Sequence, residues 1–129
     1  MWPAPTDDPF HSALALQNLA SLSTNFFRAG VERLVIAGVV ETPSEMDGCA
    51  EAVGVPLVTC RLRADADVLD DRLRARHVDD EELRWHLARA PELDQVLDAA
   101  SLEQFCVDVS RTTPSEAAYA VVELIGWTR

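Results

Sequence analysis

The sequence of 129 residues contains no lysine, and all eleven of its basic residues are arginines. Any mechanism that needs a lysine ammonium, as a Schiff base or as a phosphate ligand, is therefore excluded for this chain. The 22 acidic residues outnumber these arginines and give a formal net charge of −11. Such an acidic surface repels phosphate backbones and anionic lipid, so we expect no nucleic-acid partner and no membrane-surface role.

The sequence also lacks long apolar runs and a secretory signal. No run approaches the roughly 20 apolar residues that a membrane span needs. The first ten residues contain neither the basic region nor the apolar core of a signal peptide. The only cysteines are Cys49, Cys60 and Cys106, an odd number at wide spacing that is typical of free thiols in a reducing compartment. We therefore predict a cytoplasmic protein.

The apolar pattern predicts helices that alternate with strands, and 48% hydrophobic residues suffice for a folded core. Helical spacing is found in residues 11–29, 43–53, 65–77, 79–99 and 113–126. Unbroken apolar runs predict strands at 33–40, 56–62 and 105–109, buried on both faces as in a parallel sheet. Pro91 is expected to kink the fourth helix or to begin a new one. The order predicts one α/β domain over residues 1–129, with helices flanking a parallel sheet.

Seven of the eleven arginines lie within residues 61–89. Arg61 and Arg63 end the second predicted strand, at the carboxyl edge where open α/β sheets bind ligands, and are candidate substrate ligands. Arg72 and Arg76 are four residues apart on the following helix and share a face. Guanidinium groups bind phosphate oxygens through paired hydrogen bonds, so this cluster could bind a polyphosphate. The simpler alternative is a solvated helix whose arginines pair with neighbouring acids.

Other chemically active side chains give weaker signals. Glu41 follows the first predicted strand, where a carboxylate could hold Mg²⁺ or accept a hydroxyl proton, or could simply cap a helix. Asp108 lies in the last predicted strand, where it is costly unless it meets an arginine or the sheet margin. The histidines His11, His77 and His86 have no metal-ligand spacing with one another or with the cysteines. We therefore expect no metal site.

Four short motifs follow one another between residues 60 and 116. They are Cys60-Arg61-Leu62-Arg63, Leu69-x-x-Arg72-Leu73-x-x-Arg76, Trp85-His86-x-x-Arg89-x-x-Glu92 and Thr113-Pro114-Ser115-Glu116. In this order they resemble the C-terminal two-thirds of a small P-loop kinase. The most similar groups are nucleoside and nucleotide kinases and the adenylylsulfate- or gluconate-kinase-like proteins of actinobacteria. The resemblance implies an ATP-dependent phosphotransferase fold, with three of the usual five core strands and a helical lid.

The resemblance also implies roles for individual residues. In such kinases the lid arginines bind the nucleotide phosphates, and the loop after the last strand flanks the adenine. The matching residues here are Arg72, Arg76, Arg111, Thr113 and Pro114. Glu41 would face the phosphoryl acceptor as the catalytic candidate. The implied cofactors are ATP and Mg²⁺, and the implied partner is a nucleotide or another small-molecule acceptor.

The chain departs from these kinases in one large respect. It has no Gly-x-x-x-x-Gly-Lys-Ser/Thr loop, whose amides, lysine and hydroxyl hold the phosphates and magnesium. Phosphoryl transfer without that loop loses most of its electrostatic stabilisation. We therefore expect the lid and substrate portion of a phosphotransferase, incomplete at its N-terminus and inactive alone. The alternative is a non-catalytic α/β module for protein interaction or weak nucleotide binding.

A missing first strand also affects the sheet. The strand order in such kinases is 2-3-1-4-5, and the strands predicted here correspond to the third, fourth and fifth. Strand 1 would lie between strands 3 and 4, and its absence would leave unpaired backbone groups inside the protein, which is costly. We expect residues 33–40 to pair directly with residues 56–62. Two alternatives are a strand borrowed from a second copy of the chain and a partly molten state.

Overall fold

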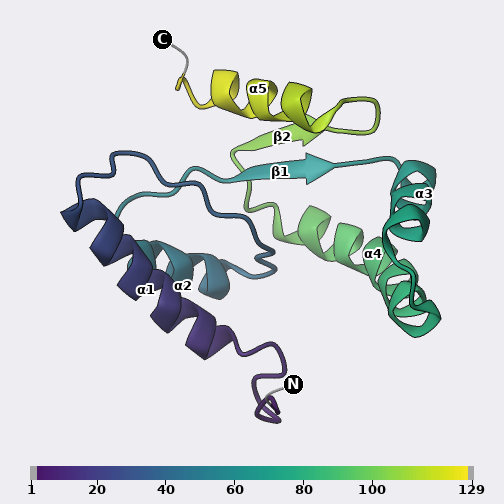
Figure 1. Cartoon of the computed structure of the whole chain (residues 1–129), viewed down its shortest axis with the longest axis horizontal. Coiled ribbons are helices and arrows are strands. Elements are labelled where there is room, and N and C mark those ends of the chain that lie inside the picture. The colour runs from purple at the N-terminus through teal and green to yellow at the C-terminus, as the bar shows by residue number, and fades with distance from the viewer. Residues whose placement is uncertain (1–2, 128–129) are drawn as a thin grey trace. The chain divides into compact units, whose positions relative to one another are not determined.

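The computed structural model describes residues 3–127 and divides into two compact units, Met1–Leu57 and Val58–Arg129. The described residues form α1 (Ser12–Arg28), α2 (Pro43–Val53), β1 (Cys60–Arg63), α3 (Ala66–Arg76), α4 (Asp80–Ala100), β2 (Phe105–Asp108) and α5 (Pro114–Leu124) (Figure 1). Helices and a parallel sheet confirm the predicted α/β class. No linker-like composition marks the boundary between the units in the sequence.

The first unit contains α1 and α2. The carboxylate of Asp8 accepts hydrogen bonds from the backbone N–H groups of Ser12 (2.6 Å) and Ala13 (2.9 Å), and so caps the start of α1. The two helices approach closely at Gly48 of α2, where an added Cβ would lie 3.3 Å from the side chain of Leu16 in α1. A side chain at position 48 would therefore require the end of the Leu16 side chain to shift by a few tenths of an ångström.

The segment between α1 and α2 corrects the sequence-based expectation. Residues 31–41 form no strand, so the strand predicted at 33–40 is wrong, and its pairing with residues 56–62 does not occur. Val35 is 82% exposed, and Ile36 and Val39 are also exposed. An apolar strand becomes stable only when neighbouring strands bond to its backbone and cover its side chains. Residues 3–127 provide no such neighbour for this segment.

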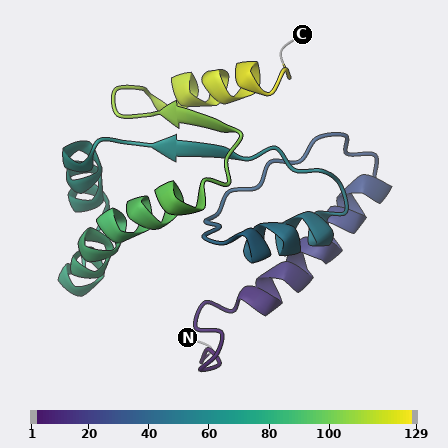
Figure 2. The same cartoon turned by 180° about the vertical axis from the view of Figure 1, so that it is seen from behind.

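The second unit is built on two parallel strands that lie side by side (Figures 1 and 2). The register runs from Cys60 opposite Phe105 to Arg63 opposite Asp108. The strands predicted at 56–62 and 105–109 are therefore confirmed in part, because pairing begins only at Cys60. Helix α5 packs against β2, where Val107 and Ala117 are buried.

The helices of the second unit follow their local signals closely. Thr113 and Glu116 form the capping box of α5, with Thr113 Oγ1 accepting from the Glu116 N–H (3.2 Å) and the Glu116 carboxylate accepting from the Thr113 N–H (2.8 Å). Helix α4 runs through Pro91 without a break, so no new helix begins there. Pro91 removes one intrahelical hydrogen bond, a loss that this 21-residue helix tolerates.

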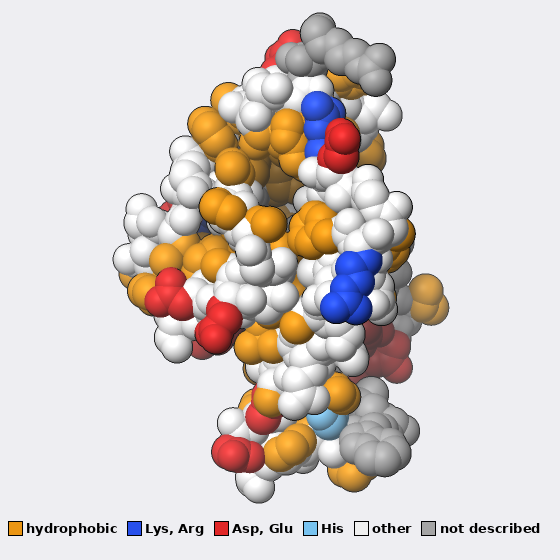
Figure 3. Space-filling model, turned by 90° about the vertical axis from the view of Figure 1, so that its left-hand side faces the viewer, with side chains coloured by type: hydrophobic (Ala, Val, Ile, Leu, Met, Phe, Trp, Pro, Cys, Tyr) orange, Lys and Arg blue, Asp and Glu red, His pale blue; other side chains and the backbone are white. Residues whose placement is uncertain are grey.

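Little of the hydrophobic surface is buried. Among the described residues only Val53, Val107 and Ala117 are buried hydrophobic residues. The accessible area is 9898 Å², whereas a globular protein of this size exposes about 6,800 Å², and two of half this size expose together about 8,200 Å². Hydrophobic side chains are visible at the surface in Figure 3. The elements therefore leave apolar surface for something else to cover.

Candidate functional site

The carboxyl ends of β1 and β2 are joined by a network of hydrogen bonds around Ser110. The Asp108 carboxylate accepts from the Ser110 backbone N–H (2.8 Å), and the Ser110 hydroxyl oxygen accepts from the Asp65 backbone N–H (2.8 Å). Asp65 stands directly before α3, so these bonds tie the loop after β2 to the start of that helix. The side-chain and backbone hydrogen bonds from Ser110 lower the pKa of Asp108, and the charges of Arg111 and Arg63 lower it further.

Arg72 fixes the same loop from α3. Its guanidinium donates to the carbonyl oxygens of Val109 (2.7 Å) and Ser110 (3.3 Å). These two acceptors lie just beyond β2, where the strand ladder has ended. Arg72 is therefore bound to the protein backbone in this structure, and its direct effect is to position the loop.

The other predicted nucleotide ligands lie nearby in the same unit. Arg76 is an exposed residue in the last turn of α3, and Arg111 is exposed in the loop between β2 and α5. Thr113 and Pro114 begin α5, with the Thr113 hydroxyl and N–H both used by the capping box. The structure thus brings Arg72 and Arg111 to the edge where sequence reasoning expected a ligand, and it assigns Thr113 a structural task.

The predicted substrate ligands Arg61 and Arg63 are held by acidic side chains of α4. The Arg61 side chain is 9% exposed, and its guanidinium donates to Asp94 and Asp98 at 2.6 Å each. Arg63 is half exposed and lies 3.5 Å from Asp94. The hydrogen bond from Arg61 is the main cause that lowers the pKa of Asp98. These ion pairs attach α4 to β1, and their acids are distant in the sequence, unlike the neighbouring acids of the alternative that the sequence suggested.

Glu41, the predicted catalytic residue, belongs to the first unit. Its backbone N–H donates to the carboxylate of Glu45 (2.7 Å) at the start of α2, and Thr42 accepts from the Glu45 N–H (3.1 Å). The residue therefore belongs to the capping structure of a helix.

Sequence reasoning missed one grouping of side chains. His77, Glu82 and His86 present ligand atoms that all lie within 4.8 Å of one another in the second unit. The pair Glu82 and His86 has the i,i+4 spacing of one helix face, a signal visible in the sequence. The approach of His77 depends on the turn between α3 and α4, which the sequence does not reveal.

Comparison with protein-family models, with curated proteins and with solved structures found no match to this chain. Within residues 3–127, the helices are too short or too polar to cross a bilayer. The resemblance to P-loop kinases therefore stays a prediction based on the motifs alone.

Proposed function

We propose that this chain is the lid and substrate portion of a P-loop phosphotransferase, with a nucleotide or polyphosphate binding at the carboxyl edge of β1 and β2. The observation that carries the proposal is the loop around Ser110, which contains the exposed Arg111 and accepts two hydrogen bonds from Arg72. Open α/β sheets bind ligands at this edge of their strands. The proposal keeps ATP and Mg²⁺ as the cofactors of the complete enzyme.

Within this proposal the arginines have different tasks. Arg72 is a positioning residue, since both of its hydrogen bonds go to backbone carbonyls of the loop. Arg111 and Arg76 are exposed, so their guanidinium groups can bind phosphate oxygens. The net charge of −11 opposes an anionic ligand, and we therefore expect weak binding that falls with added salt.

The chain by itself should transfer no phosphoryl group. It contains no lysine, and hence no phosphate-binding loop of the Gly-x-x-x-x-Gly-Lys-Ser/Thr type. The element that holds the β- and γ-phosphates must therefore come from outside residues 1–129. Glu41 remains the candidate for contact with the phosphoryl acceptor in the complete assembly.

A second candidate function is a non-catalytic interaction module. It is favoured by the exposed apolar residues of the segment 31–41, above all Val35 at 82% exposure. Large exposed apolar patches on soluble proteins mark interaction sites. In this alternative the segment pairs with a strand of a protein partner, and the arginines of the second unit contribute only to stability.

Titration calorimetry with ATP and with pyrophosphate tests the first candidate. We expect weak binding to the wild-type chain and several-fold weaker binding to Arg111→Ala and Arg76→Ala. Arg84→Ala is the matched control, because Arg84 is an exposed arginine of α4 and its removal changes the net charge equally. An equal loss in the control would mean that only total charge matters. No binding to the wild type would favour the interaction module.

A further inference from the structure

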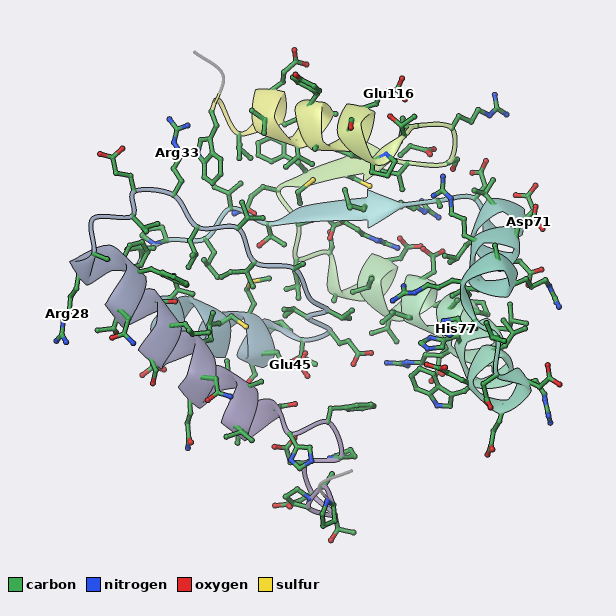
Figure 4. The ribbon with its side chains drawn as sticks, viewed as in Figure 1. Arg28, Arg33, Glu45, Asp71, His77 and Glu116 are labelled. Atoms are coloured by element: carbon green, nitrogen blue, oxygen red, sulfur yellow. The ribbon has the colours of Figure 1, made fainter. Side chains whose placement is uncertain are left out.

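His77, Glu82 and His86 meet where the end of α3 approaches the start of α4, and Figure 4 shows His77 in this position. Nδ1 of His77 lies 3.4 Å from one carboxylate oxygen of Glu82. Nε2 of His86 lies 3.9 Å from the other carboxylate oxygen. Two imidazoles therefore flank a single carboxylate, in a part of the molecule separate from the loop around Ser110.

His77 is buried without full hydrogen bonding. Its side chain is 8% exposed, and its Nε2 atom has no hydrogen-bond partner among the described residues. A buried polar atom that lacks a partner is costly, and such atoms in native proteins usually point to a missing water or ion. A buried ring whose Nε2 has no partner and whose Nδ1 faces a carboxylate is the first sign of a ligand at this place.

The two imidazole rings lie against each other. The ring centroids of His77 and His86 are 4.3 Å apart, and the rings are stacked with an angle of 20° between their planes. The two histidines are thus close enough for their ring nitrogens to serve one small ligand.

We propose that His77, Glu82 and His86 bind a divalent transition-metal ion of the Zn²⁺ class. Two imidazole nitrogens and one carboxylate oxygen suit Zn²⁺, Ni²⁺ or Cu²⁺ better than Mg²⁺ or Ca²⁺. Ligand atoms around tetrahedral Zn²⁺ are about 3.3 Å apart, given metal–nitrogen distances of about 2.0–2.1 Å. The pair His77 and Glu82 already has this separation, whereas the rings must rotate out of their stack to converge on one ion.

The surroundings of the cluster fit a cation. An open surface depression beside it is lined by Asp79, Glu81, Glu82, Trp85 and His86, so an ion can enter from solvent. The carboxylates of Asp79 and Glu81 raise the local concentration of cations. Since His77 follows α3 and the other two ligands belong to α4, a bound ion would cross-link the two helices of the predicted lid.

Co²⁺ titration of the full chain, followed by visible absorption, tests this site. We expect one equivalent to bind with the ligand-field bands of nitrogen and oxygen ligands and without a thiolate charge-transfer band. Glu82→Gln and His86→Gln should weaken binding tenfold or more. His11→Gln removes a histidine of the first unit and should leave binding unchanged. We avoid substituting His77, because its burial makes misfolding a competing explanation.

Thermal unfolding with Zn²⁺ gives a second readout. Zn²⁺ should raise the Tm of the wild type and of His11→Gln, because an ion that binds only the folded state stabilises it. It should not raise the Tm of His86→Gln, whose helix content is checked by circular dichroism. The proposal is overturned if the wild type binds no Co²⁺, if a thiolate band assigns the ion to cysteine, or if the Gln variants bind as tightly as the wild type.

Discussion

Replacement of Arg61 by alanine should destabilise the second unit by about 2–4 kcal/mol. The Arg61 side chain is 9% exposed and donates at 2.6 Å to both Asp94 and Asp98. A hydrogen bond to a charged group contributes about 1.5–3 kcal/mol. The two carboxylates are 41% and 51% exposed, so water recovers part of each bond after the substitution. The expected loss is therefore smaller than the roughly 3–6 kcal/mol that two fully retained bonds of this kind would contribute.

Urea unfolding followed by tryptophan fluorescence measures this loss. A Trp2→Phe background leaves Trp85 and Trp127 as the only tryptophans, and both belong to the second unit. Arg63→Ala is the matched control, since Arg63 is half exposed and its contact with Asp94 is 3.5 Å long. An exposed pair of this kind contributes about 0–1 kcal/mol. Equal losses in the two variants would refute the reasoning, as would a loss for Arg61→Ala of less than about 0.5 kcal/mol.

Two further predictions concern pH and helix capping. The pKa of Asp98 is lower in the folded protein than its ordinary value of 3.8. The stability that ionised Asp98 contributes is therefore complete above pH 3.8 and is lost as the pH falls through the lowered pKa. Below pH 3.8, the Tm of Asp98→Asn should fall less steeply with pH than the Tm of the wild type. Thr113→Ala should cost about 1 kcal/mol in urea unfolding because it removes the cap of α5, whereas Thr113→Ser should keep most of the stability. A full loss in the serine variant would contradict the capping explanation.

The helices could be predicted from the sequence because their signals are local. The predicted helix 11–29 is found at Ser12–Arg28, and Thr113 with Glu116 specified the start of α5 by side chains three residues apart. Spacing along one helix and the chemistry of a cap do not depend on distant parts of the chain. For the same reason the i,i+4 pair of Glu82 and His86 was visible in principle.

The prediction of a strand at 33–40 was wrong because the stability of a strand depends on its neighbours. Its apolar, β-branched composition suits a buried strand, yet no partner strand is present among residues 3–127. The partners of Arg61 were hidden for a similar reason, since Asp94 and Asp98 lie more than 30 residues further along the chain. The sequence therefore indicated that these arginines are important, whereas their acidic partners are apparent only in the structure.

Nitrogen-15 amide spectra of the full chain, recorded during titration with ATP, test the central claim most directly. The account predicts that the largest shifts occur at the backbone amides of residues 109–113 and of Asp65 and Arg76, and that Arg111→Ala reduces them. Residues 109–113 and Asp65 lie at the carboxyl edge of β1 and β2, and Arg76 is an exposed residue in the last turn of α3. An absence of shifts at high ATP concentration would contradict the proposed nucleotide site, and so would shifts confined to the first unit.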